Sequence, residues 1–172
     1  MLPQTHGCVC VFRSLQSDDY FPAHFDTYDK SVDVGGTQHK VVVTEVECRD
    51  PTAQPLWPMY MRSMDAFVLL YDVTCPASLA FATERHAELV RERQTPRVPA
   101  VLVGTKADAA TGRAVTTQEG AAAAERLGCP FFEVSARDGT NVHDAVVAAA
   151  AAALCDNNKS STTNNKGNCI VM

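Results

Sequence analysis

The sequence lacks the features that mark three broad classes of protein. No run of about 18 apolar residues occurs, so we expect no membrane-spanning helix. The formal net charge is −5, which argues against general nucleic-acid binding because phosphate contacts need clustered lysine and arginine. The N-terminal residues lack a basic start followed by a long apolar run, so we expect no secretory signal.

Patterns typical of catalytic and metal sites are also scarce. The seven cysteines are odd in number and irregularly spaced, so reduced thiols are the default expectation. Cys8 and Cys10 are too close together for the usual zinc spacing. The five histidines are isolated, and no nucleophile lies at a suitable spacing from a base, which gives little support to an unrelated α/β enzyme.

What is present is an alternation of strand and helix patterns in a chain long enough for one domain with a full core. Gly35-Gly36 predicts a hairpin turn, Thr116 and Glu119 predict a helix-capping box, and Gly128 predicts the end of that helix. The alternation predicts an α/β fold with a parallel sheet, helices on both faces, and ligands at the carboxyl ends of the strands. The expected strands cover residues 31–34, 39–46, 65–73, 99–104 and 130–135, and the expected helices cover 77–93, 121–127 and 141–154.

The composition changes near the C-terminus. Residues 156–168 contain only Asp, Asn, Ser, Thr, Lys and Gly, with nothing apolar to bury, so we expect a disordered tether. We therefore divide the chain into a folded part, residues 1–154, and a tether, residues 155–172, that ends in Cys169-Ile170-Val171-Met172.

Two short motifs lie at the carboxyl ends of predicted strands. They are Thr105-Lys106-Ala107-Asp108 and Ser135-Ala136-Arg137. A carboxylate such as Asp108 can accept two hydrogen bonds at once from guanine N1–H and N2–H, whereas adenine offers no such pair of donors. The stem of Lys106 can cover the flat face of the base, and the backbone N–H of Ala136 can donate to O6.

These motifs resemble N/T-K-x-D and S-A-K, two guanine-recognition elements of the Ras superfamily of small GTPases. Residues 71–79 resemble that family's strand-to-helix turn, and Tyr60-Met61-Arg62-Ser63 resembles its Y-M-R-T helix. The resemblance extends over about residues 12–154. It implies a three-layer G-domain fold, with a mostly parallel sheet and one antiparallel hairpin, that binds GTP or GDP. The guanine-binding residues would be Thr105, Lys106, Asp108, Ser135, Ala136 and Arg137.

The segment before the hairpin resembles the family's first switch, through which such proteins contact effectors. The Phe-Asp-x-Tyr form and Thr105 are similar to the Rho branch, but the Rho insert after the guanine motif is missing. The choice between the Ras and Rho branches therefore stays open. The switch residues would be Tyr20, Pro22, Phe25, Asp26 and Tyr28.

The family's phosphate loop, G-x-x-x-x-G-K-S/T, is missing from the sequence. The eleven residues before Phe12 contain one glycine, Gly7, and no lysine. That loop holds phosphates with successive backbone N–H groups, a helix N-terminus and a lysine. Residues 6–12 either insert as the family's first, central strand or form the end of its first helix, which would leave a central position of the sheet vacant.

The residues that would bind Mg²⁺ and orient water are also altered. Ala23 replaces the threonine of the first switch. In the second switch, Glu45 replaces the aspartate, Cys48 the glycine and Arg49 the glutamine. Glu45 is a weak candidate metal ligand because its extra methylene misplaces the carboxylate. We expect weak nucleotide binding, doubtful Mg²⁺ binding and absent or very slow hydrolysis, and we assign no catalytic residue.

The last four residues form a C-a-a-X box in which Met172 favours farnesylation of Cys169. One lipid gives only marginal membrane binding, and Lys159 and Lys166 are too few for a basic patch. Cys155 is a candidate for a second lipid, although packing at the end of its helix is favoured. These features predict weak, reversible attachment to the cytoplasmic face of a membrane, with a cytosolic pool.

Two functions are compatible with this sequence. One is a GTP-binding switch in membrane signalling that contacts effector or regulator proteins through its first switch. It requires an upstream start that restores the phosphate loop, so the sequence would be an incomplete gene model or splice form. The other is a pseudo-GTPase, an interaction module tethered to a membrane that works without nucleotide.

Overall fold

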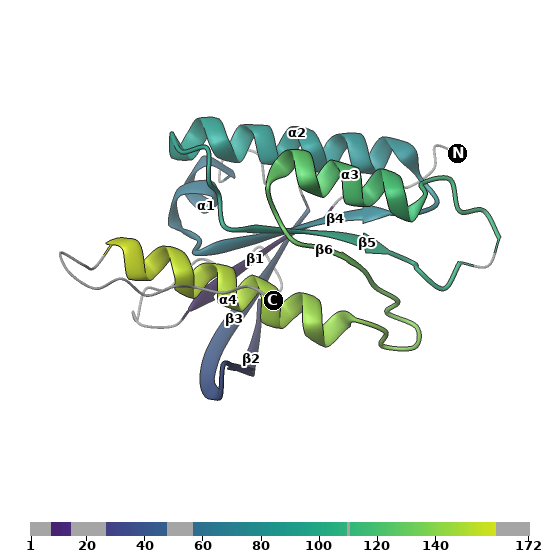
Figure 1. Ribbon diagram of the computed structural model, residues 1–172. Coiled ribbons are helices and arrows are strands. Elements are labelled where there is room, and N and C mark those ends of the chain that lie inside the picture. The colour runs from purple at the N-terminus through teal and green to yellow at the C-terminus, as the bar shows by residue number, and fades with distance from the viewer. Residues whose placement is uncertain (1–7, 15–26, 48–56, 110, 161–172) are drawn as a thin grey trace.

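The computed structural model describes residues 8–14, 27–47, 57–109 and 111–160 (Figure 1). Six strands form one sheet in the order β2-β3-β1-β4-β5-β6. The strands are β1 (Cys8–Ser14), β2 (Thr27–Val34), β3 (Thr37–Glu47), β4 (Ala66–Asp72), β5 (Ala100–Thr105) and β6 (Phe131–Glu133). The helices are α1 (Trp57–Ser63), α2 (Pro76–Arg93), α3 (Thr117–Leu127) and α4 (Val142–Ser160).

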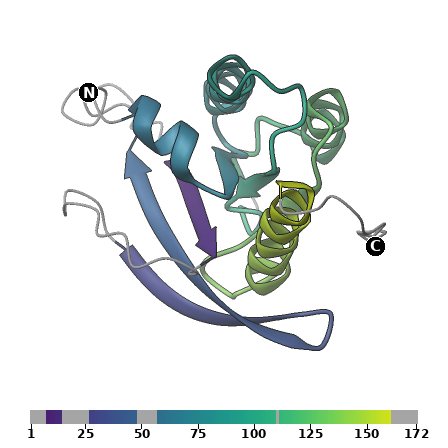
Figure 2. The ribbon, with the colours of Figure 1, turned by 90° about the vertical axis from the view of Figure 1, so that its left-hand side faces the viewer.

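The helices lie on both faces of this sheet. Helices α1, α2 and α3 cover one face and α4 covers the other (Figure 1, Figure 2). Helix α2 packs on β4 and α3 packs on β5 and β6, whereas α4 crosses β1, β2, β4 and β5. Each helix layer encloses its own apolar cluster against the sheet. The three-layer α/β fold expected from the sequence is confirmed.

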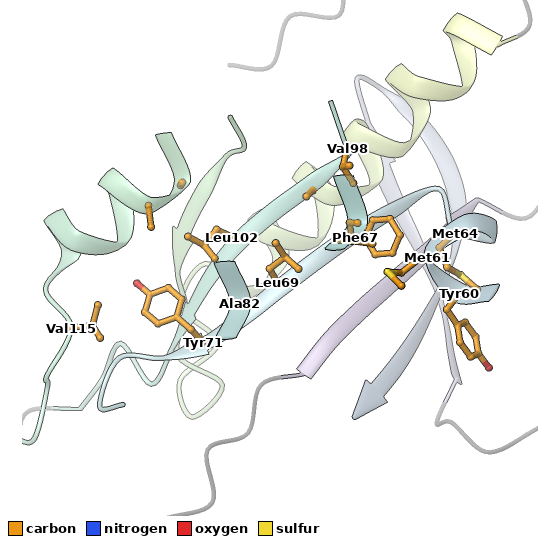
Figure 3. Close-up of a cluster of buried hydrophobic side chains, with 14 of the residues drawn as sticks. Tyr60, Met61, Met64, Phe67, Leu69, Tyr71, Ala82, Val98, Leu102 and Val115 are labelled. Atoms are coloured by element: carbon orange, nitrogen blue, oxygen red, sulfur yellow. The ribbon is translucent and has the colours of Figure 1, made fainter. Parts of the chain in front are cut away.

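Strand β4 contributes to both apolar clusters. Successive side chains of a strand point to opposite faces of a sheet. Phe67, Leu69 and Tyr71 pack into the cluster under α1, α2 and α3, where Figure 3 shows them in a row. Ala66 and Val68 pack into the cluster under α4. This explains why β4 is apolar along its length, as a strand buried on both faces must be.

Strand β1 fills the central position of the sheet, between β3 and β4. Of the two possibilities for this segment, insertion as a strand is therefore confirmed. The strand runs antiparallel to both neighbours, so that Cys8 pairs with Glu47 and Phe12 pairs with Ala66. Its amino end lies beside the carboxyl ends of β3 and β4. Its carboxyl end, at Ser14, therefore lies beside the amino ends of these two strands.

The sheet has an antiparallel part, formed by β2, β3, β1 and β4, and a parallel part, formed by β4, β5 and β6. Strands β4, β5 and β6 are parallel, and β1 is antiparallel to β3 and to β4. Strands β2 and β3 form the expected antiparallel hairpin. Gly35 and Gly36 supply the positive φ of its turn, 63° and 83°.

The expected capping of α3 is also confirmed. The Thr116 hydroxyl accepts a hydrogen bond from the N–H of Glu119 at 3.2 Å, and the N–H of Thr116 donates to the Glu119 carboxylate at 2.8 Å. Gly128 ends the helix in the left-handed region with φ of 69°. These contacts satisfy backbone groups that have no partner within the helix itself.

Helix α4 is longer than expected and continues past Leu154 to Ser160, into the start of the polar segment. The run of alanine before this point has high helix propensity, and adding residues to an existing helix is easier than starting one. None of the helices in the described ranges is both long enough and apolar enough to cross a bilayer.

Near the end of α4, Cys155 is disulfide-bonded. This contradicts the expectation that all thiols are reduced, and it leaves no free thiol at this position for a second lipid. Cys75 and Cys129 are free. Cysteine spacing along a chain does not reveal which sulfur atoms the fold brings together, so the sequence could not predict this bond.

Candidate guanine-binding site

The carboxyl ends of β4, β5 and β6 lie side by side, and hydrogen bonds join them. The N–H of Val73 donates to the carbonyl of Thr105 at 3.2 Å, and the Thr105 hydroxyl donates to the carbonyl of Tyr71 at 2.9 Å. The N–H of Ala107 donates to the carbonyl of Val134 at 3.0 Å. These bonds hold the segments that follow β5 and β6 at a fixed separation.

The Asp108 side chain projects from the first of these segments and is 22% exposed. Its Oδ1 accepts a hydrogen bond from the Ser135 hydroxyl at 2.8 Å, and its Oδ2 lies 3.3 Å from an Arg137 guanidinium nitrogen. An ionised carboxylate has about four acceptor positions, so Asp108 has room for two further N–H donors. The Arg137 side chain is 82% exposed, and such exposed pairs contribute only about 0–1 kcal/mol, so a ligand can displace it.

The turn after β6 fixes the position of Ser135. The N–H of Ser135 donates to the carbonyl of Thr140 at 3.1 Å, and its carbonyl accepts from the N–H of Gly139 at 2.9 Å. Asp138 accepts hydrogen bonds from the hydroxyl and N–H of Thr140, which lower the pKa of its carboxyl. The turn therefore holds the Ser135 hydroxyl against Asp108 and adds a second ionised carboxylate nearby.

Lys106 adopts the left-handed conformation, with φ of 62°. Its ammonium contacts Asp72 Oδ2 at 2.6 Å, and Asp72 Oδ1 accepts hydrogen bonds from the N–H and the hydroxyl of Thr74 at 2.8 and 2.7 Å. Burial raises the pKa of Asp72, but the hydrogen bonds from Lys106 and Thr74 outweigh burial and lower it. Because this pKa is lower than in the unfolded chain, the pair stabilises the fold above the unfolded pKa, and that contribution is lost as the pH falls through the folded pKa.

Comparison with known proteins identifies the fold that carries these strand ends. The Ras family model matches residues 9–155. The chain belongs to the Ras family. Over 134 residues it is 34% identical to the GTP-binding protein RAD of Mus musculus. The aligned residues make up 77% of this chain and 42% of that protein.

Two further Ras-family relatives show similar levels of identity. The Ras-like protein rasV of Dictyostelium discoideum is 30% identical over 131 residues, 74% of this chain and 57% of that protein. The GTP-binding protein GEM of Homo sapiens is 33% identical over 119 residues, 69% of this chain and 40% of that protein. The chain thus spans less than two thirds of the length of each of these relatives.

The structure brings the expected guanine-binding residues of this Ras-family chain together. All of them lie at the adjacent carboxyl ends of β5 and β6, on the same edge of the sheet. Their role in binding the base stays a prediction. They are Thr105, Lys106, Asp108, Ser135, Ala136 and Arg137.

The expected switch residues are only partly visible. Tyr28 lies within β2, opposite Val43, and its side chain is 56% exposed. Glu45 lies within β3, opposite Cys10, because the strand continues to Glu47 instead of ending near Thr44. The other expected switch residues and the expected lipidation site lie outside the described residues: Tyr20, Pro22, Ala23, Phe25, Asp26, Cys48, Arg49 and Cys169.

Within the ranges that the structure describes, no group of three or more His, Cys, Asp or Glu side chains is placed to hold a metal ion. Mg²⁺ binding in the Ras family depends on the phosphate loop and switches, and the switch positions 23 and 48 lie outside those ranges. The weak candidate ligand, Glu45, has a described backbone but no described side chain.

Sequence reasoning missed two residues of this site, Asp72 and Thr74. Asp72 is the last residue of β4 and Thr74 follows two positions later, at the carboxyl end of the third strand that reaches this end of the sheet. The available signal was their position at the carboxyl end of the apolar run at residues 65–73, where parallel sheets present ligand-binding residues. The contact with Lys106 itself had no signal, because the two residues are 34 positions apart.

Proposed function

We propose that this chain is a Ras-like GTP-binding protein that recognises guanine nucleotides through the base and works in membrane-associated signal transduction with little or no GTP hydrolysis. The observation that carries the proposal is the position of Asp108. Its carboxylate is held by the buried Ser135 hydroxyl and, among the described residues, forms an ion pair only with a displaceable arginine. The relatives RAD and GEM, both GTP-binding proteins, support the same interpretation.

The direction of β1 supports the low hydrolytic activity that we propose. A phosphate loop must follow the carboxyl end of a strand that points toward the base-binding edge. Strand β1 is antiparallel to β4, so its carboxyl end, at Ser14, lies at the end of the sheet opposite Asp108. The sequence also carries Glu45, Cys48 and Arg49 where the family has residues that hold Mg²⁺ and water. Charge stabilisation of a transferring phosphate would therefore be poor.

The same proposal covers partners and location. The exposed Tyr28 on the edge strand β2 is available to effector or regulator proteins. Farnesylation of Cys169 would place the chain reversibly at the cytoplasmic face of a membrane. Incubation with farnesyl transferase and labelled farnesyl diphosphate is expected to label the chain, and Cys169→Ser is expected to abolish the label. Labelling that persists in Cys169→Ser would contradict this assignment.

Titration with guanine and adenine nucleotides tests base recognition. We expect GDP and GTP to bind with micromolar to millimolar affinity and ATP to bind more weakly. Asp108→Asn removes the charged acceptor and is expected to weaken GDP binding about 5- to 150-fold, the equivalent of losing roughly 1–3 kcal/mol. The matched control is Asp144→Asn, an exposed aspartate in the first turn of α4, which should leave affinity unchanged.

The pseudo-GTPase alternative makes a different prediction for the same titration. An interaction module that works without nucleotide would bind GDP and ATP equally weakly, and Asp108→Asn would change nothing. A third outcome, tight and Mg²⁺-dependent GTP binding with measurable hydrolysis, would contradict both the degraded phosphate site and the pseudo-GTPase reading.

A further inference from the structure

The charged side chains of the guanine-binding segments neutralise one another. Lys106 is paired with Asp72, and Arg137 is paired with Asp108. These four groups carry two positive and two negative charges. Guanine is uncharged, so the sum stays at zero even when the base displaces Arg137 from Asp108. The ionised Asp138 carboxylate in the turn after β6 adds one more negative charge.

Asp72 is the fixed member of the pair with Lys106. Its side chain is 11% exposed, whereas that of Lys106 is 61% exposed. Two hydrogen bonds from Thr74 hold the Asp72 carboxylate in place on the side away from Lys106. If the Lys106 ammonium moved toward a phosphate, it would leave the mostly buried Asp72 carboxylate without its cation. The free energy lost in this way is larger than the free energy gained from an exposed ammonium–phosphate pair.

The left-handed backbone of Lys106 adds to this restraint. Residues other than glycine, asparagine and aspartate rarely adopt this backbone region. The φ of 62° at Lys106 therefore indicates that the surrounding contacts hold its backbone in place. The carbonyl of Lys106 accepts from the N–H of Ala109 at 2.9 Å. The stem of Lys106 therefore starts from a fixed backbone and ends on a fixed carboxylate. In that geometry the Lys106 stem can cover a base while its ammonium remains paired with Asp72.

We propose that this site takes uncharged guanine nucleosides nearly as well as guanine triphosphates, and that Asp72 is the residue that sets this preference by holding Lys106. The inference rests on the proposed recognition of guanine by Asp108. It adds that the phosphates contribute little to binding, because the Lys106 ammonium stays on Asp72 and the four charged groups around the base sum to zero.

Titration of the ¹⁵N-labelled full chain with guanosine, GMP and GTP tests this selectivity, with amide shifts of residues 105–108 and 135–137 as the readout. GTP, with and without Mg²⁺, is expected to bind less than about tenfold more tightly than guanosine, the equivalent of 1.4 kcal/mol. GTP binding is also expected to change little between 50 and 300 mM salt, because the described charged groups around the base carry no net positive charge. A preference of a hundredfold or more for GTP, or a steep loss of GTP affinity with salt, would overturn the proposal.

Asp72→Asn tests the residue that the proposal names. Asparagine keeps an acceptor for Thr74 but frees the Lys106 ammonium, so the affinity for GTP relative to guanosine is expected to rise at least about threefold. The charge-matched control is Asp144→Asn, which removes one negative charge from α4 without touching Lys106 and should leave the ratio unchanged. Equal ratios in the two variants would show that Asp72 does not set the preference. Circular dichroism of both variants establishes that they are folded.

The outcomes separate this inference from the proposed function. If guanosine and GTP both fail to shift the amides of residues 105–108, base recognition and the nucleoside preference are both wrong. If GTP binds a hundredfold more tightly than guanosine and loses affinity in Asp108→Asn, base recognition stands and the nucleoside preference is wrong. Similar affinities for both ligands, each lost in Asp108→Asn, support both.

Discussion

Gly120 lies in the interior of α3, where glycine costs about 1 kcal/mol of helix stability relative to alanine. The fold explains this cost. A Cβ atom at Gly120 would meet the Tyr71 hydroxyl and would lie 2.7 Å from Cζ of Phe131. Gly104, in β5, faces the same tyrosine ring, and a Cβ there would lie 2.7 Å from the hydroxyl. The two glycines thus make the space for Tyr71, whose pKa is raised to about 12, mainly by burial.

At this residue scale, we expect Gly120→Ala to destabilise the protein by about 1–3 kcal/mol, because overpacking outweighs the gain in helix propensity. Within the described part of the chain the Tyr71 hydroxyl has no hydrogen-bond partner, so Tyr71→Phe alone should be neutral or slightly stabilising. In the Tyr71→Phe background, the loss caused by Gly120→Ala should be smaller. Urea denaturation of the four proteins measures these terms, and a Gly120→Ala variant more stable than the parent would contradict the steric account.

At the scale of elements, the short helix α1 depends on α2 for its stability. Seven residues are too few for a stable isolated helix, and the last carbonyls of any helix lack partners within it. Arg93 of α2 donates at and just beyond this end: its Nε donates to the carbonyl of Met61 at 2.8 Å, and its Nη2 donates to that of Met64, the residue after the helix. The indole N–H of Trp57 donates to the Glu88 carboxylate of α2 at 3.2 Å.

We expect Arg93→Ala to loosen α1 while leaving the sheet intact. Losing the contacts to Met61 and Met64 should speed amide exchange at residues 60–64 about tenfold, for a local cost of roughly 1.4 kcal/mol. Trp57 is the only tryptophan of the chain, so its fluorescence should change in parallel. Arg91→Ala is the matched control, since Arg91 lies in the same last turn, is mostly exposed and comes within only 3.9 Å of Glu88. Equal effects of the two substitutions would rule out a specific role for Arg93.

At the scale of the whole molecule, β1 joins the two parts of the sheet. It lies between the β2–β3 hairpin and the parallel strands β4, β5 and β6. Without it, the ladder groups of β3 and β4 that face each other would lose their partners, and each buried unpaired group costs about 1–3 kcal/mol. The stability of the domain therefore depends on a strand from its first fourteen residues.

We expect Val11→Pro to destabilise the protein by about 3 kcal/mol or more, because Val11 pairs with Thr44 on one side and Phe67 on the other. Lys30→Pro is the comparison, since Lys30 lies in the edge strand β2 and pairs only with Val41, and edge strands tolerate proline better. Thermal unfolding followed by circular dichroism measures both. If Lys30→Pro costs as much as Val11→Pro, β1 does not occupy the centre of the sheet.

Much of this fold was predictable from the residues because the signals are local. The apolar run at residues 65–73 predicted β4, the glycine pair predicted the hairpin turn, and Thr116 with Glu119 predicted the start of α3. The placement of the two candidate guanine-binding segments was predictable because short motifs follow strands whose carboxyl ends must lie at the same end of a parallel sheet. The length of α4 was underestimated because its alanine-rich body carries the helix into polar residues.

The direction of β1 had no such signal. The pattern of a seven-residue strand gives the same alternation of faces whether it is read forward or backward. The direction depends on which neighbours fill the central position of the sheet, and these neighbours, around Thr44 and Phe67, are far away in the chain.

The sequence by itself determined the elements, their caps and turns, and the two motifs that place Asp108 and Ser135 at the ends of strands, because each depends on residues within a few positions of one another. Only the tertiary structure decided that β1 is antiparallel to both neighbours and that Asp72 forms an ion pair with Lys106. Both outcomes depend on groups that meet in space only after chain segments more than 25 positions apart have packed. Coulomb and hydrogen-bond energies depend on distance in space and not on sequence separation.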